Sequence, residues 1–186
     1  MQGQLVVVVG PSGVGKGTLV NRICAQFPDR VQLSISATTR SPRADEQDGV
    51  NYYFWTREHF LAQVEAGAFL EWAEYSGNLY GTPRRPVEEG IAQNRLVLLE
   101  IEVAGARQVK QNFPSAKRIF IMPPSLEVLE QRLRQRRSES EAAIQQRMET
   151  AIKEINCAHE FDVIIYNDDL ETATQELIRV IGLETG

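Results

Sequence analysis

The sequence has few of the residues that build metal centres or disulfide frameworks. Its 186 residues include two cysteines, Cys24 and Cys157, and two histidines, His59 and His159. The cysteines form no C-x-x-C pair and the histidines have no partner at metal-ligand spacing, so we expect no zinc site. We interpret the cysteines as reduced thiols, which is typical of a cytoplasmic protein.

Long apolar runs and an excess of positive charge are also missing. No apolar run near the first residues has the length of a signal peptide or a spanning helix, so no membrane association is expected. The formal net charge is −5, which argues against broad nucleic-acid binding. The sequence contains no internal repeat. We expect a monomer and leave a homo-oligomer open.

Several short runs of valine, isoleucine and leucine stand out instead. Nearly continuous apolar runs of this length are typical of strands that are buried on both faces of a parallel sheet. Helical patterns lie between them, and this alternation predicts an α/β fold with right-handed βαβ units. The five runs are Leu5–Val9, Val31–Ile35, Leu96–Ile101, Arg118–Met122 and Val163–Tyr166.

Four segments show apolar stripes at helical spacing. Ser125 is a good N-cap for the second of them, because its hydroxyl can accept a hydrogen bond from a backbone N–H of the first turn. The stripes are Leu19, Val20, Ile23, Cys24 and Phe27; Leu126, Leu129 and Leu133; Ile144, Met148, Ile152 and Ile155; and Leu177, Ile178 and Ile181.

Two segments interrupt the alternation of strands and helices. Residues 36–93 are rich in aromatic and turn residues, and "FLEWAEYSG" within them alternates like a half-exposed strand. We predict an inserted subdomain with some antiparallel sheet there. The charged stretch "RQRRSESE" predicts an exposed, mobile cap. The predicted division is a core of 1–35, 94–126 and 148–186, an insertion of 36–93 and a lid of 127–147.

The stretch "GPSGVGKGT" has the pattern of a phosphate-binding loop, G-x-x-x-x-G-K. It follows a predicted strand and opens a predicted helix, which is the setting that such a loop requires. Glycines let the backbone N–H groups surround a phosphate, and the lysine adds a point charge. The alternative is a glycine-rich turn with a surface lysine. The predicted ATP-binding residues here are Gly10, Pro11, Ser12, Gly13, Val14, Gly15, Lys16, Gly17 and Thr18.

Gly17 departs from the usual pattern, in which a serine or threonine follows the lysine and binds magnesium. The next hydroxyl, on Thr18, arrives one position late and could touch either a phosphate or the metal. The ending "GKGT" resembles the loop of adenylate kinases, where magnesium is held chiefly by nucleotide phosphates and water. The loop therefore favours transfer between two nucleotides.

Over essentially its full length the chain resembles the guanylate kinases, which transfer phosphate from ATP to GMP. The resemblance is carried by "GPSGVGKGT", "SISATTRSPRADEQDGVNYYF", "FLEWAEYSGNLYGT", "LLEIEVAGARQV", "IFIMPPS" and "NDD", together with a group of later arginines. It implies a P-loop NTPase-type parallel sheet of five strands, an inserted mixed-β domain for GMP and a small helical lid. ATP and GMP are the implied substrates, with Mg²⁺ bound alongside ATP.

The resemblance places Glu71 against guanine. Guanine presents N–H donors at N1 and its 2-amino group, so one carboxylate can accept from both, whereas adenine offers neither donor. Ser36 and Thr82 match hydroxyl positions near the O6 edge. Without the resemblance, the alternation of Glu71 with Trp72 leaves a solvated strand residue equally open.

The resemblance also assigns cationic and hydroxyl side chains to the GMP phosphate. Arg40 and Arg43 correspond to a phosphate clamp, since a guanidinium fork fits phosphate. Tyr52 and Tyr80 correspond to phenolic donors, with ordinary sheet residues as the alternative, and Glu46 to the group that orients the cluster.

A second arginine group, Arg132, Arg136 and Arg147, matches the lid and hinge of the family. With Lys16, Arg40 and Arg43 these side chains are the predicted catalytic set, which neutralises charge in the transition state. A basic helix end or a nucleic-acid patch is the alternative. Asn167 in "NDD" matches a position near the adenine, and a simple turn residue is equally open.

One motif differs from the family, which usually has D-I-D where this chain has Glu100-Ile-Glu102. Period two places both carboxylates on one face of the strand end. Glu100 is a candidate to hold magnesium through water, and Glu102 to contact GMP. An ion pair with Lys16 or an arginine is the alternative.

The resemblance implies a cytoplasmic enzyme that phosphorylates GMP and dGMP. Two rivals stay open: a kinase for AMP, UMP or dTMP, and a catalytically weak guanylate-kinase-like module that binds proteins. The intact lysine and glycines of the loop favour the enzyme over the module.

Overall fold

The computed structural model describes residues 2–135 and 140–183. Its larger sheet has five strands, all parallel, in the order β2-β7-β1-β8-β9. Each of them overlaps one of the five predicted apolar runs, so the predicted parallel sheet of an α/β fold is confirmed. The strands are β1 (Gln4–Val9), β2 (Val31–Leu33), β7 (Leu96–Glu100), β8 (Lys117–Met122) and β9 (Val163–Tyr166).

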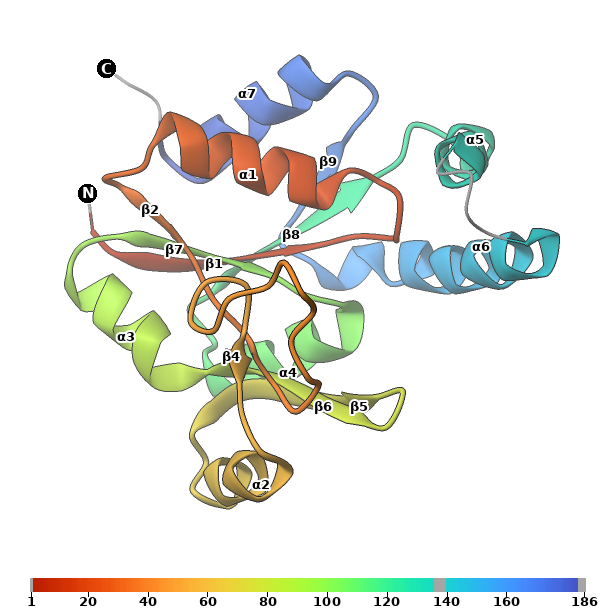
Figure 1. Cartoon of the computed structure of the whole chain (residues 1–186). Coiled ribbons are helices and arrows are strands. Elements are labelled where there is room, and N and C mark those ends of the chain that lie inside the picture. The colour runs from red at the N-terminus through yellow and green to blue at the C-terminus, as the bar shows by residue number, and fades with distance from the viewer. Residues whose placement is uncertain (1, 136–139, 184–186) are drawn as a thin grey trace.

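Helices cover both faces of this sheet (Figure 1). Val6 and Val8 of β1 pack in the same cluster as residues of α1 (Lys16–Gln26) and α7 (Leu170–Val180). Val7 and its odd-numbered neighbours pack on the other face, against α3 (Arg84–Ala92) and α4 (Val103–Asn112). Because both faces are covered, every second position in β1 is as apolar as the positions between.

Two further helices are α5 (Leu126–Gln135) and α6 (Glu141–Asn156). The Val128 N–H donates to Ser125 Oγ at 3.2 Å, which confirms the predicted start of α5. Leu126, in the predicted stripe, is the first residue of the helix and is 41% exposed. A short 3₁₀ helix, η1 (Ala158–Glu160), follows α6.

The predicted stripe of α6 is wrong at one position. Ile152 is 40% exposed, whereas Ala151 is 1% exposed. At 3.6 residues per turn, the seventh residue after Ile144 lies about 20° from it around the helix, and the eighth about 80° away. Ala151 therefore faces the core with Ile144, and Ile152 faces solvent.

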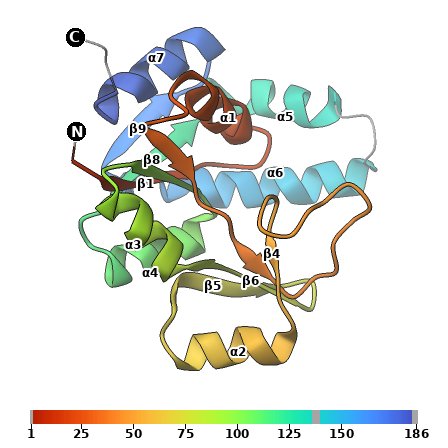
Figure 2. The same cartoon turned by 60° about the vertical axis from the view of Figure 1, so that its left-hand side comes forward.

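A second, smaller sheet lies below the first, with α2 (Arg57–Glu65) on its far side (Figures 1 and 2). Its order is β4-β3-β6-β5, with a parallel β3–β4 pair and antiparallel pairs elsewhere, so the predicted mixed sheet is confirmed. Phe60 of α2 stacks on Phe69 at 4.4 Å between ring centroids. The strands are β3 (Ala37–Thr38), β4 (Tyr53–Phe54), β5 (Phe69–Tyr75) and β6 (Asn78–Pro83).

The boundaries predicted at residues 36 and 93 stay a prediction. Within that segment, α3 packs against the larger sheet, and its Val87 belongs to the same apolar cluster as Val97 of β7. The smaller sheet is thus joined to the larger one through a helix that the predicted insertion includes.

The expected alternation along β5 is wrong. Phe69, Leu70 and Glu71 are all buried, and the strand is exposed from Trp72 to its end. The pairing register with β6 shifts between Phe69 and Glu71, which breaks the period of two. The first half of β5 also packs against α4, while the second half extends beyond it as a hairpin with β6.

The carboxyl ends of neighbouring parallel strands meet at one edge of the larger sheet. Val8 pairs with Glu100, so the loop after β1 leaves the sheet beside the end of β7. Asn167, just after β9, donates its backbone N–H to the Met122 carbonyl at 2.8 Å at the same edge. Open α/β sheets bind ligands at this edge. Within the described residues, no helix is both long enough and apolar enough to cross a membrane.

Candidate active site

The loop from Gly10 to Gly15 connects β1 to α1. Gly15 is the N-cap of α1 with a φ of 96°, in the left-handed region, and its absence of a side chain leaves the helix end without a side-chain cap. The Val14 N–H donates to the Pro11 carbonyl at 3.2 Å and closes a turn. The first backbone N–H groups of α1 therefore face the loop, which is the geometry of a phosphate site.

Asn167 supports this loop from behind. Its side chain is buried, and Nδ2 donates to the Val14 carbonyl at 2.7 Å. The Arg132 guanidinium donates to the Asn167 carbonyl at 3.0 Å and to the Val14 carbonyl at 3.4 Å. The predicted place of Asn167 near adenine stays a prediction, since its side chain contacts the loop at Val14.

Three cationic side chains lie around the loop. Lys16 Nζ donates to the Gly10 carbonyl and, at 3.4 Å, to the Pro11 carbonyl. Arg147, on α6, donates to Ser12 Oγ at 2.6 Å. The fold thus brings together the predicted lysine and two of the predicted lid arginines, Arg132 and Arg147. Arg136 lies outside the described residues.

Burial lowers the pKa of Lys16, and the carboxylates of Glu100, Glu154 and Glu102 oppose this effect. Glu154 comes from α6, two helical turns after Arg147, and sequence reasoning missed it. Spacing along the helix was the available signal, because residues seven positions apart share a face.

Glu100 faces Gly17. A Cβ at Gly17 would lie 3.6 and 3.7 Å from the two carboxylate oxygens, which is ordinary van der Waals contact. Desolvation by the surrounding wall raises the pKa of Glu100, and the charge of Lys16 opposes the rise. Thr18, the displaced hydroxyl, is exposed.

A pocket of about 360 Å³ lies between this edge and the smaller sheet. Residues of β5 and β6, with Ser36 and Tyr52, form one wall, and residues from the end of β7 to the start of α4 form the other. The pocket brings together six of the predicted residues, which are Ser36, Tyr52, Glu71, Tyr80, Glu100 and Glu102. Ala73, Tyr75, Gly81, Ile101, Ala104 and Gly105 complete the lining.

Glu71 is 8% exposed, so the alternative of a solvated strand residue is wrong. Its Oε1 accepts a hydrogen bond from Thr82 Oγ1 at 2.6 Å. Burial raises the pKa of Glu71, hydrogen bonds from Thr82 oppose the rise, and the charge of Glu102 adds to it. A buried carboxylate on a pocket wall is a group that a ligand with N–H donors would satisfy.

Gly105 makes room for this carboxylate. A Cβ at Gly105 would lie 2.9 Å from Glu71 Oε2. Sequence reasoning did not single out Gly105, and nothing in its local pattern marks it. Ala73 and Tyr75 follow Glu71 at period two on β5, a signal that could have placed them in the pocket.

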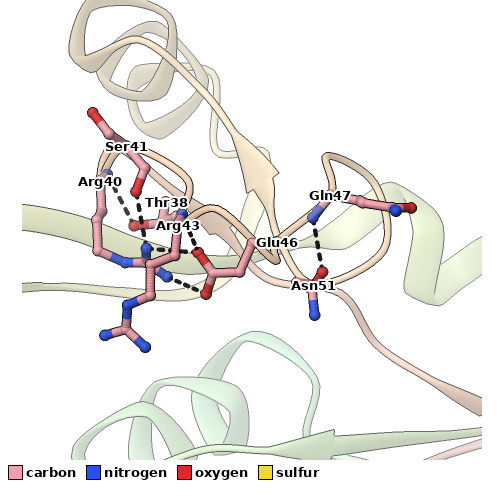
Figure 3. Close-up of polar contacts among 7 residues, drawn as sticks. All are labelled: Thr38, Arg40, Ser41, Arg43, Glu46, Gln47 and Asn51. Carbon is pink, nitrogen blue, oxygen red and sulfur yellow. Dashed lines mark hydrogen bonds and ion pairs between the residues drawn. The ribbon is translucent and has the colours of Figure 1, made fainter.

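Arg40 and Glu46 form a two-pronged ion pair beside the pocket (Figure 3). Arg40 NH1 and NH2 each donate to one carboxylate oxygen at 2.8 Å, and the Arg43 backbone N–H donates to Glu46 Oε2 at 2.8 Å. The hydrogen bonds from the Arg40 side chain, followed by the one from the Arg43 backbone, lower the pKa of Glu46 to about 2. The guanidinium of Arg43 points away from the pair (Figure 3).

The ion pair reaches the pocket through aromatic rings. The Arg40 guanidinium lies over the ring of Tyr52, 5.4 Å from its centroid. Tyr52 meets Tyr80 edge-on at 6.2 Å, and both tyrosines line the pocket. Arg134, on α5, pairs instead with Glu130 and Glu141 at 2.7 and 2.5 Å.

The match to a family model agrees with this arrangement. The guanylate kinase model matches residues 2–184. The chain belongs to the guanylate kinase family. A guanylate kinase from Synechocystis sp. is 60% identical over 184 residues, which cover 99% of this chain and 96% of the relative. One from Thermosynechococcus vestitus is 54% identical over 183 residues, covering 98% and 92%.

A solved structure is also similar. The crystal structure of guanylate kinase from Anaplasma phagocytophilum matches with a TM-score of 0.72 and 31% sequence identity, and the match covers 97% of this chain and 85% of that one. The full-length resemblance predicted from the sequence motifs is confirmed as membership of the guanylate kinase family.

Replacing Gly15 by alanine should damage the loop. The new Cβ would lie 2.6 Å from Asn167 Nδ2, at a backbone conformation with φ of 96°. We expect Gly15→Ala to lower the free energy of unfolding by about 1–3 kcal/mol, measured by urea denaturation. Gly17→Ala is the matched control, because it should keep or raise stability by up to about 1 kcal/mol. Equal effects of the two changes would contradict the geometry.

The Arg40–Glu46 pair predicts a pH dependence of stability. The pKa of Glu46 falls from 4.5 to about 2 on folding, so its contribution is complete above about pH 4.5 and is lost as pH falls toward 2. In urea denaturation, the stability advantage of wild type over Glu46→Gln should shrink between about pH 6 and about pH 3. A constant or growing advantage would exclude this ionised pair.

Proposed function

We propose that this chain transfers the γ-phosphate of ATP to GMP, and to dGMP, giving ADP and GDP. One observation carries this proposal: a buried carboxylate, Glu71, faces a pocket at the same sheet edge as the phosphate loop. The pocket thus adjoins both a base-reading group and a phosphate-binding helix end. Membership of the guanylate kinase family supports the assignment.

Glu71 reads the base in this proposal. Its two oxygens accept from guanine N1–H and the 2-amino group, while the Thr82 hydroxyl holds the carboxylate at 2.6 Å. Adenine offers no donor at those positions, and a buried carboxylate left without donors costs about 1–3 kcal/mol or more. This cost discriminates against AMP. Ser36 is assigned to the O6 edge and Glu102 to the opposite wall.

The GMP phosphate is assigned to Arg40, Arg43, Tyr52 and Tyr80. The Glu46 carboxylate fixes the Arg40 guanidinium by accepting hydrogen bonds from its two terminal nitrogens, NH1 and NH2. The exposed Arg43 guanidinium and the two phenol groups supply further donors. A planar guanidinium presents two parallel donors, which match the oxygens of a phosphate.

The ATP phosphates are assigned to the loop from Gly10 to Thr18. Backbone N–H groups at the start of α1 bind the phosphate oxygens, and Lys16 adds a positive charge. Arg132 and Arg147 already contact the loop at Val14 and Ser12, so they are placed to neutralise charge on the transferred group. Arg136 completes the proposed set.

Magnesium fits the residues present as a partner of bound nucleotide. The described part of the chain offers no group of three or more acidic, histidine or cysteine side chains that could hold a metal alone. Mg²⁺ prefers phosphate oxygens and water with one or two carboxylates, and Glu100 beside Gly17 supplies one. Bound there with ATP, the ion would offset phosphate charge.

No side chain of the chain needs to act as a general base. The second pKa of a phosphate monoester is about 6, so the attacking oxygen of GMP is already an anion near neutral pH. The protein then contributes alignment of the two phosphates and stabilisation of the developing charge. Movement of the inserted segment 36–93 and the lid 127–147 toward the core would exclude water and limit ATP hydrolysis. One chain supplies every group assigned here, so we propose a monomer as the active unit.

A direct assay tests the proposed reaction. The purified chain is given ATP and Mg²⁺ with a panel of monophosphates, and ADP formation is followed. GMP and dGMP should be used and AMP hardly at all, and Lys16→Ala should lower kcat by about 10²–10³-fold because one fixed charge is lost. Failure with every monophosphate would favour the protein-binding module instead.

Replacing Glu71 by glutamine tests the reading of guanine. The amide keeps one acceptor but turns a donor toward a donor of the base. We expect kcat/KM for GMP to fall by about 10–100-fold, while the KM for ATP changes little. Circular dichroism and the urea midpoint serve as controls for folding. An equal rise in both KM values would show that Glu71 does not read the base.

A further inference from the structure

One face of α4 is fitted to three consecutive residues of β5. Gln108 Oε1 accepts from the Trp72 N–H at 3.1 Å, and Gln108 Nε2 donates to the Trp72 carbonyl at 2.9 Å. Asn112 Nδ2 donates to the Leu70 carbonyl at 2.8 Å. Glu71, between these two residues, has its Oε2 beside Gly105 of the same helix.

The spacing explains why three residues of α4 act together. Gly105, Gln108 and Asn112 are separated by three and four positions, so they lie on one face of α4. The two amides hold the backbone on either side of Glu71, and the glycine leaves space for its carboxylate. A Cβ at position 105 would approach Oε2 to 2.9 Å and displace it.

The strand needs such a hold because β5 is the edge of the smaller sheet. An edge strand presents unpaired backbone N–H and C=O groups, and its register is open to slippage. The register between β5 and β6 shifts between Phe69 and Glu71, directly before the carboxylate. A slip of one residue would turn Glu71 to the other face of the sheet.

We propose that Gln108 and Asn112 are positioning residues for Glu71. Their hydrogen bonds fix the position of β5 along α4 and so prevent a slip of its register with β6. Both carboxylate oxygens of Glu71 then meet the two N–H donors of guanine. This inference rests on the proposed function, since it concerns how the base-reading group is held. It also fastens that group to α4, whereas Arg40 and Glu46 lie on the loop between β3 and β4.

The test compares GMP with inosine monophosphate, which lacks the 2-amino group and can give Glu71 only the N1–H. The variant is Gln108→Met, which keeps the length of the side chain and removes its hydrogen bonds. We expect kcat/KM for GMP to fall about tenfold, and the preference for GMP over inosine monophosphate to fall with it. The KM for ATP should stay within about twofold of wild type.

Gln111→Met is the matched control. Gln111 is exposed on the same helix, and the substitution is chemically identical. This control should retain the GMP preference of wild type. Asn112→Leu is the second variant, because it removes one hydrogen bond rather than two. It should lower the GMP preference by about threefold, and it keeps the test decisive if Gln108→Met does not fold.

The outcomes separate positioning from general support of the fold. A variant that is merely less stable loses activity toward both monophosphates equally, and an unchanged preference in the folded variants would overturn the inference. If wild type is active on GMP, an unchanged preference in the variants overturns only this inference and leaves the proposed function standing. If wild type phosphorylates no monophosphate, the proposed function fails and this inference fails with it.

Discussion

The central position of β1 is the constraint on which the rest of the structure depends. It pairs in parallel with β7 on one side and with β8 on the other, and its even- and odd-numbered residues are buried on opposite faces. The parallel pairing with both neighbours places the carboxyl end of β1 beside theirs. The phosphate loop, Glu100 and Asn167 therefore leave the sheet at one edge, although they are distant in sequence.

The charged groups at that edge are arranged in local balance within an acidic chain. The formal net charge is −5, yet Lys16, Arg132 and Arg147 surround a single loop. The carboxylates of Glu100, Glu102 and Glu154 oppose the lowering of the Lys16 pKa by burial. The two arginines donate hydrogen bonds to a carbonyl and a hydroxyl of the loop. Cationic side chains thus gather at the loop and carboxylates line the adjoining pocket, which suits a site for two phosphate groups and a cation.

The sequence predicted the elements whose pattern is local, and missed features that depend on packing between elements. The five strands followed from apolar runs, because both faces of a parallel sheet are covered. The exposure of Ile152 agrees with the helical period, which turns the eighth residue after Ile144 about 80° away from it. The burial of Glu71 did not follow from the pattern, since it depends on which neighbour covers that position. Gly105 carries no periodic signal, and only its distance from Glu71 Oε2 reveals its part. The contact of Asn167 with Val14 joins segments 153 residues apart.

The two-pronged pair of Arg40 and Glu46 has an energetic consequence for binding. An arginine side chain loses about 2 kcal/mol of rotamer entropy when it is fixed. Here that ordering is completed during folding, by the two hydrogen bonds to Glu46 and by the ring of Tyr52. A phosphate that meets this guanidinium does not have to immobilise it, but must share it with a carboxylate. In the proposed site, preorganised geometry rather than the surplus of positive charge therefore sets the strength of the contact.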